Sequence, residues 1–190
     1  GCMESQTVHL MYGLSGLFPF HLGIAEDETS AKEIYEDYRF YDRNVYFYPA
    51  KDLLFFQADI HGNLLIRQRM QVVRALMEKD SVTVVTSVDG CMDYLMPLED
   101  IRKRLLHFEN GGIVDLDKLK KDLVELGYER TGQVELPGHF SVRGGIIDIY
   151  PLTEENPWRI ELWDDEIDSI RSFDAESQRS LENLEEITIY

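Results

Sequence analysis

Cysteine is scarce in this chain of 190 residues: Cys2 and Cys91 are its two copies. They are too few and too far apart to form a disulfide framework or a cysteine-based metal site, so we expect a reducing, cytoplasmic setting. Long apolar runs are also missing, which excludes a transmembrane helix of ordinary length. The start, Gly1–Glu4, lacks the basic stretch and apolar run of a secretory signal, so we expect no signal peptide and no membrane partner.

Positive charge is the next deficit. The chain has 19 Lys and Arg against 36 Asp and Glu, a net charge of −17. Residues 1–104 carry −5 and residues 105–190 carry −12 of this total. Such an acidic chain is a poor independent binder of nucleic acid, because that affinity comes mostly from cations that neutralise phosphates. An adaptor that meets a basic protein surface fits the composition better.

Motifs for catalysis are absent as well. A P-loop needs several glycines, a lysine and a Ser or Thr, whereas Gly1–Thr7, ahead of the first expected helix, has one glycine, no lysine and the acidic Glu4. The five histidines show no H-E-x-x-H spacing, and no G-x-S-x-G elbow is present. The acids Asp164–Asp168 are of the type that holds a hard cation, but a solvated turn is the commoner outcome. We therefore expect no catalytic residue, cofactor or metal ligand.

Helical and strand patterns alternate over residues 1–104, with short connections. The patterns predict a helix at 5–14, a buried strand at 21–25, a helix from a Ser30–Glu33 capping box to Asn44, a strand at 45–48, a loop at 49–63, a helix at 64–78, a strand at 81–88 and a short helical segment to about residue 98. This order is typical of an α/β domain with a parallel sheet.

The pattern changes at residue 105, where strands dominate. We expect strands at 105–109, 130–136, 140–143, 145–150, 158–163, 166–173 and 187–190, and helices at 116–126 and 177–184. Asp115 caps the first of these helices and Gly127 stops it. Residues 105–190 therefore predict a small α+β domain, mostly antiparallel.

The stretch Gly138–Pro151 organises this second domain. It indicates a strand, a Gly144-Gly145 bend and a second strand, with Arg143 held at the bend. Arg159 and Trp163 follow on a neighbouring strand-like run, and Arg and Trp are enriched among interface anchors. These three residues predict a docking patch. The alternative from the residues alone is that both arginines only pair with nearby carboxylates.

Several motifs of the chain, taken together, resemble those of a known family. Gly138–Pro151, Trp158–Asp168 and Phe173–Leu181, with Tyr48–Asp52 and the helix around Arg67 upstream, resemble the N-terminal UvrB-like module of bacterial transcription-repair coupling factors. The resemblance covers essentially the whole chain. It implies a degenerate P-loop, helicase-like α/β domain at residues 1–104, followed by an inserted α+β domain at residues 105–190 that binds the repair protein UvrA.

Two departures distinguish the chain from UvrB itself. UvrB has an intact P-loop, and it carries a long aromatic β-hairpin that clamps DNA, for which the stretch from Pro49 to Leu64 is too short. Both departures match the coupling factors, whose module lacks ATPase chemistry. The resemblance further implies that the parent protein is an ATP-dependent DNA translocase, which contacts RNA polymerase and DNA through regions outside this chain.

The resemblance assigns UvrA contact to Arg143, Arg159 and Trp163. The neighbouring acids Asp164, Asp165 and Glu166 either orient these arginines or meet cations on UvrA. The expected function is that of a non-catalytic adaptor that recruits UvrA to stalled transcription complexes in nucleotide excision repair. The alternative is a UvrB-type, nucleotide-dependent repair or helicase domain with ATPase activity. A third hypothesis is a regulatory module whose UvrA-facing surface is covered by other domains of the same protein.

Overall fold

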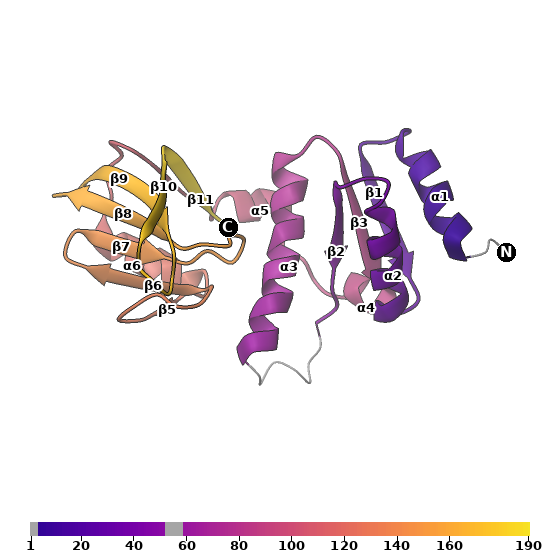
Figure 1. Cartoon of the computed structure of the whole chain (residues 1–190), viewed down its shortest axis with the longest axis horizontal. Coiled ribbons are helices and arrows are strands. Elements are labelled where there is room, and N and C mark those ends of the chain that lie inside the picture. Colours follow the sequence, from indigo (N-terminus) through magenta and orange to yellow (C-terminus); the bar gives the residue numbers. More distant parts are fainter. Residues whose placement is uncertain (1–3, 52–58) are drawn as a thin grey trace. The chain divides into compact units, whose positions relative to one another are not determined.

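The computed structural model describes residues 4–51 and 59–190. Two compact units make up the chain, residues 1–98 and 99–190, and each is described by itself (Figure 1). The expected boundary at residue 105 lies a few residues after the division between them.

The first unit is a parallel sheet with helices on both faces. Its strands are β1 (Phe20–Ala25), β2 (Val45–Tyr48) and β3 (Val82–Ser87), in the order β1-β3-β2. Its helices are α1 (Glu4–Ser15), α2 (Glu28–Tyr38), α3 (Asp59–Glu78) and α4 (Val88–Cys91), and α5 (Leu98–Arg102) follows at the division. The α/β expectation for this part is confirmed.

Strand β3 lies at the centre of this sheet, and all six of its residues are buried, as its β-branched run predicts. Val85 packs in a core with residues of α1 and α2. Val84 and Val82 pack on the other face against Val72 and Ala75 of α3. The helices therefore cover both faces of the sheet at β3 (Figure 1).

Strand β1 corrects one expectation, because it is not buried. Phe20, Leu22 and Ile24 are each more than half exposed. The strand lies at the edge of the sheet, and α3 packs against β2 and β3 instead. The apolar run predicted a strand correctly, but it did not reveal that one face lacks a cover within the described residues.

The boundaries of two helices also differ from expectation. The Ser30–Glu33 capping box does not start α2, because Asp27 is its N-cap and accepts a hydrogen bond from the Ser30 N–H at 2.8 Å. This helix ends at Tyr38 rather than at Asn44. Helix α3 begins at Asp59, inside the expected loop of residues 49–63, and residues 52–58 of that loop lie outside the described residues.

The second unit contains a six-stranded sheet in the order β10-β9-β8-β7-β6-β5, a two-stranded sheet of β11 and β4, and one longer helix. All neighbouring strands are antiparallel except the β5–β6 pair. The elements are β4 (Leu106–Glu109), α6 (Leu116–Glu125), β5 (Glu129–Arg130), β6 (His139–Arg143), β7 (Ile146–Ile149), β8 (Trp158–Trp163), β9 (Glu166–Phe173), β10 (Ser180–Leu184) and β11 (Glu186–Ile189). The expected, mostly antiparallel α+β arrangement is confirmed.

Two elements of this unit were predicted wrongly. Residues 177–184 were expected to be a helix, but the Ser177 N–H and hydroxyl both donate to Asp174, at 2.8 and 2.6 Å. Gln178 then adopts a positive φ of 59°, so the chain turns and continues as strand β10. Strand β5 has two residues instead of the expected seven, because the Thr131 hydroxyl donates to the Gln133 carbonyl and turns the chain away.

The core of the second unit lies on one face of the six-stranded sheet. Leu119 and Leu123 of α6 are buried in the same cluster as Phe140, Ile147 and Ile160 of the strands. Alternate strand residues point to opposite faces, so the other face of β6, β7 and β8 carries mainly polar side chains, with Ile146 among them. That second face carries the two arginines of the predicted docking patch.

The N-cap of α6 gives a test of stability against pH. The Asp115 carboxylate accepts hydrogen bonds from the Asp117 and Lys118 N–H groups, each at 3.0 Å. These bonds, chiefly the one from Lys118, hold its pKa below the ordinary value of 3.8. The ionised carboxylate therefore stabilises the fold at neutral pH, and this contribution is lost as the pH falls below about 4.

We expect Asp115→Ala to lower the melting temperature at pH 7 and the deficit to shrink as the pH falls below about 4. Asp115→Asn is the matched control, because Asn caps helices well without titrating. Thermal unfolding followed by circular dichroism between pH 3 and pH 7 measures both. A deficit of Asp115→Ala that does not change with pH would contradict this role.

The turn between β6 and β7 depends on two glycines. Gly144 has a φ of +59° with open space around it, in the left-handed region that side chains rarely adopt. Gly145 lies against the next strand: its carbonyl accepts from the Leu162 N–H at 2.7 Å, and a Cβ on it would approach the Leu162 carbonyl oxygen to 2.9 Å. The two glycines therefore fix where Arg143 leaves the sheet.

We expect Gly145→Ala to lower the free energy of unfolding by about 1–3 kcal/mol and to speed hydrogen exchange at the Leu162 amide. Gly144→Ala should cost about 1 kcal/mol, from the backbone conformation alone, and should leave that amide protected. Chemical denaturation and amide exchange by NMR measure the two effects. Equal protection of the Leu162 amide in both variants would refute the close approach at Gly145.

Candidate partner-binding surface

The six-stranded sheet has a polar face opposite its core. Cross-strand neighbours on this face run Ser141–Asp148–Arg159–Arg171 along one row and Arg143–Ile146–Glu161–Ser169 along the next. We call this the polar face and define it by Ser141, Arg143, Asp148, Arg159, Glu161, Ser169 and Arg171. The register thus brings Arg143 and Arg159 to the same face, as the sequence predicts.

A buried carboxylate joins the two arginines. Asp148 has a side chain 1% exposed, and it accepts from Arg143 Nη2 at 2.8 Å on its Oδ2. Arg159 donates to the same group twice, from Nε to Oδ1 at 2.6 Å and from Nη2 to Oδ2 at 2.8 Å. One carboxylate therefore serves two guanidinium groups.

Arg159 is held on further sides. Its guanidinium carbon lies 4.5 Å from the centre of the buried Phe173 ring, a cation–π arrangement. Its Nη2 also donates to the Gln178 side-chain oxygen at 3.2 Å. The hydrogen bond to Asp148 is the main cause that raises the pKa of Arg159 above its ordinary value. Its side chain is 14% exposed, against 51% for Arg143.

A second ion pair balances the next arginine of the row. Arg171 lies directly opposite Arg159 across β8 and β9, and two like charges in that position would repel. Arg171 instead pairs with Glu161 through Nη1 and Nη2. The Ser169 hydroxyl also donates to Glu161, at 3.3 Å. The row is therefore arranged as two separate arginine–carboxylate groups.

The other predicted residues lie at the hairpin that joins β8 to β9. Trp163 is 81% exposed and pairs across the hairpin with Glu166. Asp164 has a φ of 61°, which turns the chain, and the Asp165 carbonyl accepts from the Val114 N–H at 2.8 Å. Among the described residues, neither arginine bonds to these acids, and the carboxylate that holds the arginines is Asp148.

The β6–β7 turn and the hairpin lie at the same end of the sheet. The carbonyl of Gly145, two residues after Arg143, bonds to the amide of Leu162, which precedes Trp163. The structure therefore brings Arg143, Arg159 and Trp163 into one region. The alternative that the arginines pair with carboxylates also holds, but half of the Arg143 side chain stays exposed.

Two residues of this surface escaped the sequence analysis. Asp148 interrupts the apolar run of β7, which was a signal that could have been used, but its arginine partners depend on the register. Ile113 is 68% exposed and forms a backbone bridge with Glu166, so Trp163, Glu166 and Ile113 lie in one cross-strand row. Nothing in the sequence around Ile113 indicates that this loop residue joins the hairpin.

The stretch where a P-loop would lie, Gly1–Thr7, is partly outside the described residues. A P-loop connects a strand to a helix, and in the described part the first such junction runs from β1 to α2. Three acids, Glu26, Asp27 and Glu28, occupy it. The Glu28 carboxylate accepts from the Ala50 N–H at 3.3 Å and from the Ser87 hydroxyl at 3.0 Å. Carboxylates therefore make the hydrogen bonds at this junction, and their negative charge would repel a phosphate.

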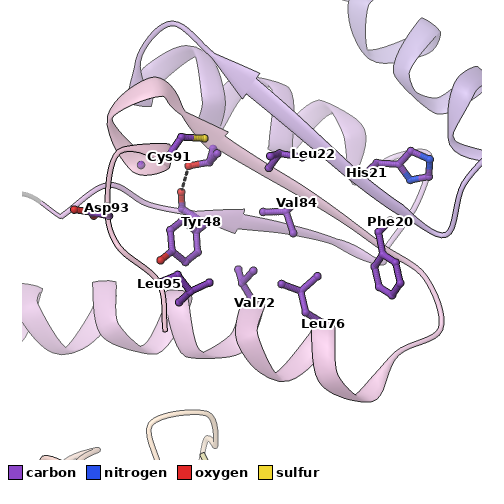
Figure 2. A pocket seen from close by; sticks show the side chains of 12 residues that line it. Phe20, His21, Leu22, Tyr48, Val72, Leu76, Val84, Cys91, Asp93 and Leu95 are labelled. Carbon is purple, nitrogen blue, oxygen red and sulfur yellow. Dashed lines mark hydrogen bonds between the residues drawn. The ribbon is translucent and has the colours of Figure 1, made fainter. Parts of the chain in front are cut away.

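An apolar cavity of about 540 Å³ lies in the first unit between the sheet and α3. Figure 2 shows Leu22 and Val84 of the sheet facing Val72 and Leu76 of α3 across this space. Two polar groups of its lining already have partners, whereas the buried Nε2 of His21 has none among the described residues. Asp93 accepts from Arg69 at 2.7 Å, and the Thr86 hydroxyl donates to the Tyr48 carbonyl at 2.7 Å. The rest of the lining is mostly apolar.

Within residues 4–51 and 59–190, no three His, Cys, Asp or Glu side chains converge as metal ligands. No helix of the described part is long and apolar enough to cross a membrane.

Comparison with known proteins identifies relatives of both parts of the chain. Residues 106–190 match the UvrB interaction domain family. The chain is 44% identical over 166 residues to the transcription-repair-coupling factor of Bacillus subtilis, covering 87% of this chain and 13% of that protein. It is 39% identical over 145 residues to the transcription-repair-coupling factors of Staphylococcus haemolyticus and Staphylococcus aureus, covering 76% of this chain and 12% of each.

The chain thus spans about an eighth of the length of these relatives. Residues 106–190 of the second unit match the UvrB interaction domain family, and the chain is similar to transcription-repair-coupling factor over most of its length, as its motifs indicate.

Proposed function

We propose that this chain is the non-catalytic adaptor of a transcription-repair-coupling factor, which recruits UvrA to stalled transcription complexes in nucleotide excision repair. The family of residues 106–190 and the name of the relatives support this role. The observation that carries the proposal is the Arg143–Asp148–Arg159 cluster beside the exposed Trp163. Together they provide charged donors and an aromatic anchor at one end of a rigid sheet.

The binding surface consists of Arg143, Arg159 and Trp163, with Asp164, Asp165 and Glu166 at the hairpin. Trp163 offers most of its large side chain for burial, and a Trp at the centre of an interface is a frequent hot spot. Arg143 offers a planar fork that grips a carboxylate with two hydrogen bonds. The three acids, which bond to neither arginine within the described residues, are placed to meet cations on UvrA.

Nucleotide chemistry is not part of the proposal. The acids at the β1–α2 junction, and the bonds that Glu28 makes to Ala50 and Ser87, support a structural role for that junction. We assign the ATP-dependent motor, and the contacts to RNA polymerase and DNA, to other parts of the longer protein. Those other domains are also partners of this chain and share its polar face with UvrA in turn.

We expect purified UvrA to bind this chain without added nucleotide, and Arg143→Ala and Trp163→Ala each to weaken binding roughly 30-fold, or about 2 kcal/mol. Lys121→Ala is the control, because Lys121 lies on α6, which packs on the opposite face of the sheet. Its affinity should equal that of the wild type. Calorimetry or surface plasmon resonance gives the four affinities, those of the wild type and of the three variants.

Two results would overturn this proposal. If the wild-type chain does not bind UvrA, the adaptor role is wrong. If the chain binds and both variants bind as tightly as Lys121→Ala, UvrA contacts another surface of the chain.

A further inference from the structure

We propose that Asp148 is the positioning residue of this surface: its buried carboxylate fixes both guanidinium groups and leaves one positive charge, on Arg143, for a carboxylate of the partner to neutralise. This inference rests on the proposed function, since the partner is UvrA. The two arginines thus have separate roles: Asp148 and its surroundings hold Arg159, whereas Arg143 meets a carboxylate of the partner.

The charges on the polar face do not balance. Arg171 and Glu161 form one complete pair. The other group has two arginines, Arg143 and Arg159, against the single carboxylate of Asp148. Among the described residues, no second carboxylate lies within ion-pair distance of Arg143. In a chain with a net charge of −17, this point carries an excess positive charge.

The hydrogen bonds show which arginine is available. Arg159 uses Nε and Nη2 on Asp148, adds Gln178 as a further acceptor and lies over the Phe173 ring. Its side chain is 14% exposed. Arg143 donates to Asp148 through Nη2 alone and is 51% exposed. A guanidinium has five N–H donors, so Arg143 keeps an unused edge toward solvent.

Burial of Asp148 explains why the position of Arg143 is fixed. The residues on either side, Ile147 and Ile149, are fully buried in the core, so the backbone that carries Asp148 is anchored by packing. A buried carboxylate must stay paired, and it therefore holds both guanidinium groups in place. A side chain that is ordered before binding loses less conformational entropy when the complex forms.

Removal of the Asp148 charge distinguishes positioning from charge alone. Asp148→Asn keeps the shape of the side chain but makes the surface more positive by one charge. If Arg143 and Arg159 acted only through their charge, an acidic site on UvrA would be bound more tightly. If Asp148 positions them, we expect binding to weaken at least about 10-fold, mainly through faster dissociation, because orientation and packing act on the dissociation rate.

Glu161→Gln is the matched control. It adds the same charge to the same face by removing the partner of Arg171, but Glu161 bonds to neither Arg143 nor Arg159. Its affinity for UvrA should stay within about twofold of the wild type, with any change in the association rate. Surface plasmon resonance at two salt concentrations measures both rates for each variant.

If circular dichroism shows that Asp148→Asn does not fold, a second variant tests the positioning role. Arg143→Lys keeps the charge on a half-exposed side chain but cannot hold Asp148 and a second carboxylate through one planar fork. We expect a loss of at least about fivefold in affinity. Wild-type affinity for Arg143→Lys, or equal or tighter binding by folded Asp148→Asn, overturns the positioning role while the adaptor role stands.

Absence of binding by the wild type would instead remove the proposed function. The positioning role of Asp148 can then be tested without UvrA, by measuring the mobility of the arginine side-chain Nε–H groups in the free chain by NMR relaxation. Asp148→Asn should mobilise both Arg143 and Arg159, whereas Glu161→Gln should leave them as in the wild type. Unchanged mobility in Asp148→Asn overturns the proposal.

Discussion

The buried Asp148 carboxylate is the constraint on which the arrangement of the second unit depends. A charge that is 1% exposed in the middle of a strand is tolerated only when it is paired and hydrogen-bonded. Both neighbouring strands meet this requirement, β6 with Arg143 and β8 with Arg159. The same bonds that make the burial tolerable therefore link three strands and set the direction of the arginines that we propose to face UvrA.

The sheet register makes these bonds possible. Asp148 lies directly opposite Arg159, and Arg143 opposite Ile146. A slip of one residue would point the arginine to the core face. The bond from the Leu162 N–H to the Gly145 carbonyl fixes the β6–β7 turn against β8 and so opposes such a slip. The glycines of this turn thus support the interaction surface through geometry.

Local patterns predicted those features that local chemistry determines. Strands β2, β8 and β9 were predicted to the residue, and Asp115 caps α6 as expected, because alternation and caps are visible in the sequence. Features that depend on distant residues were missed or mistaken. The role of Asp148 could not be predicted, because its arginine partners depend on the register of three strands. Residues 180–184 form a strand because Asp174 and Ser177 turn the chain ahead of them. The exposure of β1 depends on which strands α3 covers.

Carboxylates in this acidic chain have two different uses, and the difference explains how it presents a cation. Glu28 accepts bonds from neutral groups, the Ala50 amide and the Ser87 hydroxyl, so its negative charge is not neutralised there. Asp148 instead forms ion pairs with two guanidinium groups, so this cluster carries one excess positive charge. Exposed charges are screened over about 8 Å at physiological ionic strength. A partner that touches Arg143 therefore meets the local excess of positive charge, whereas the charge of −17 acts mainly on its approach.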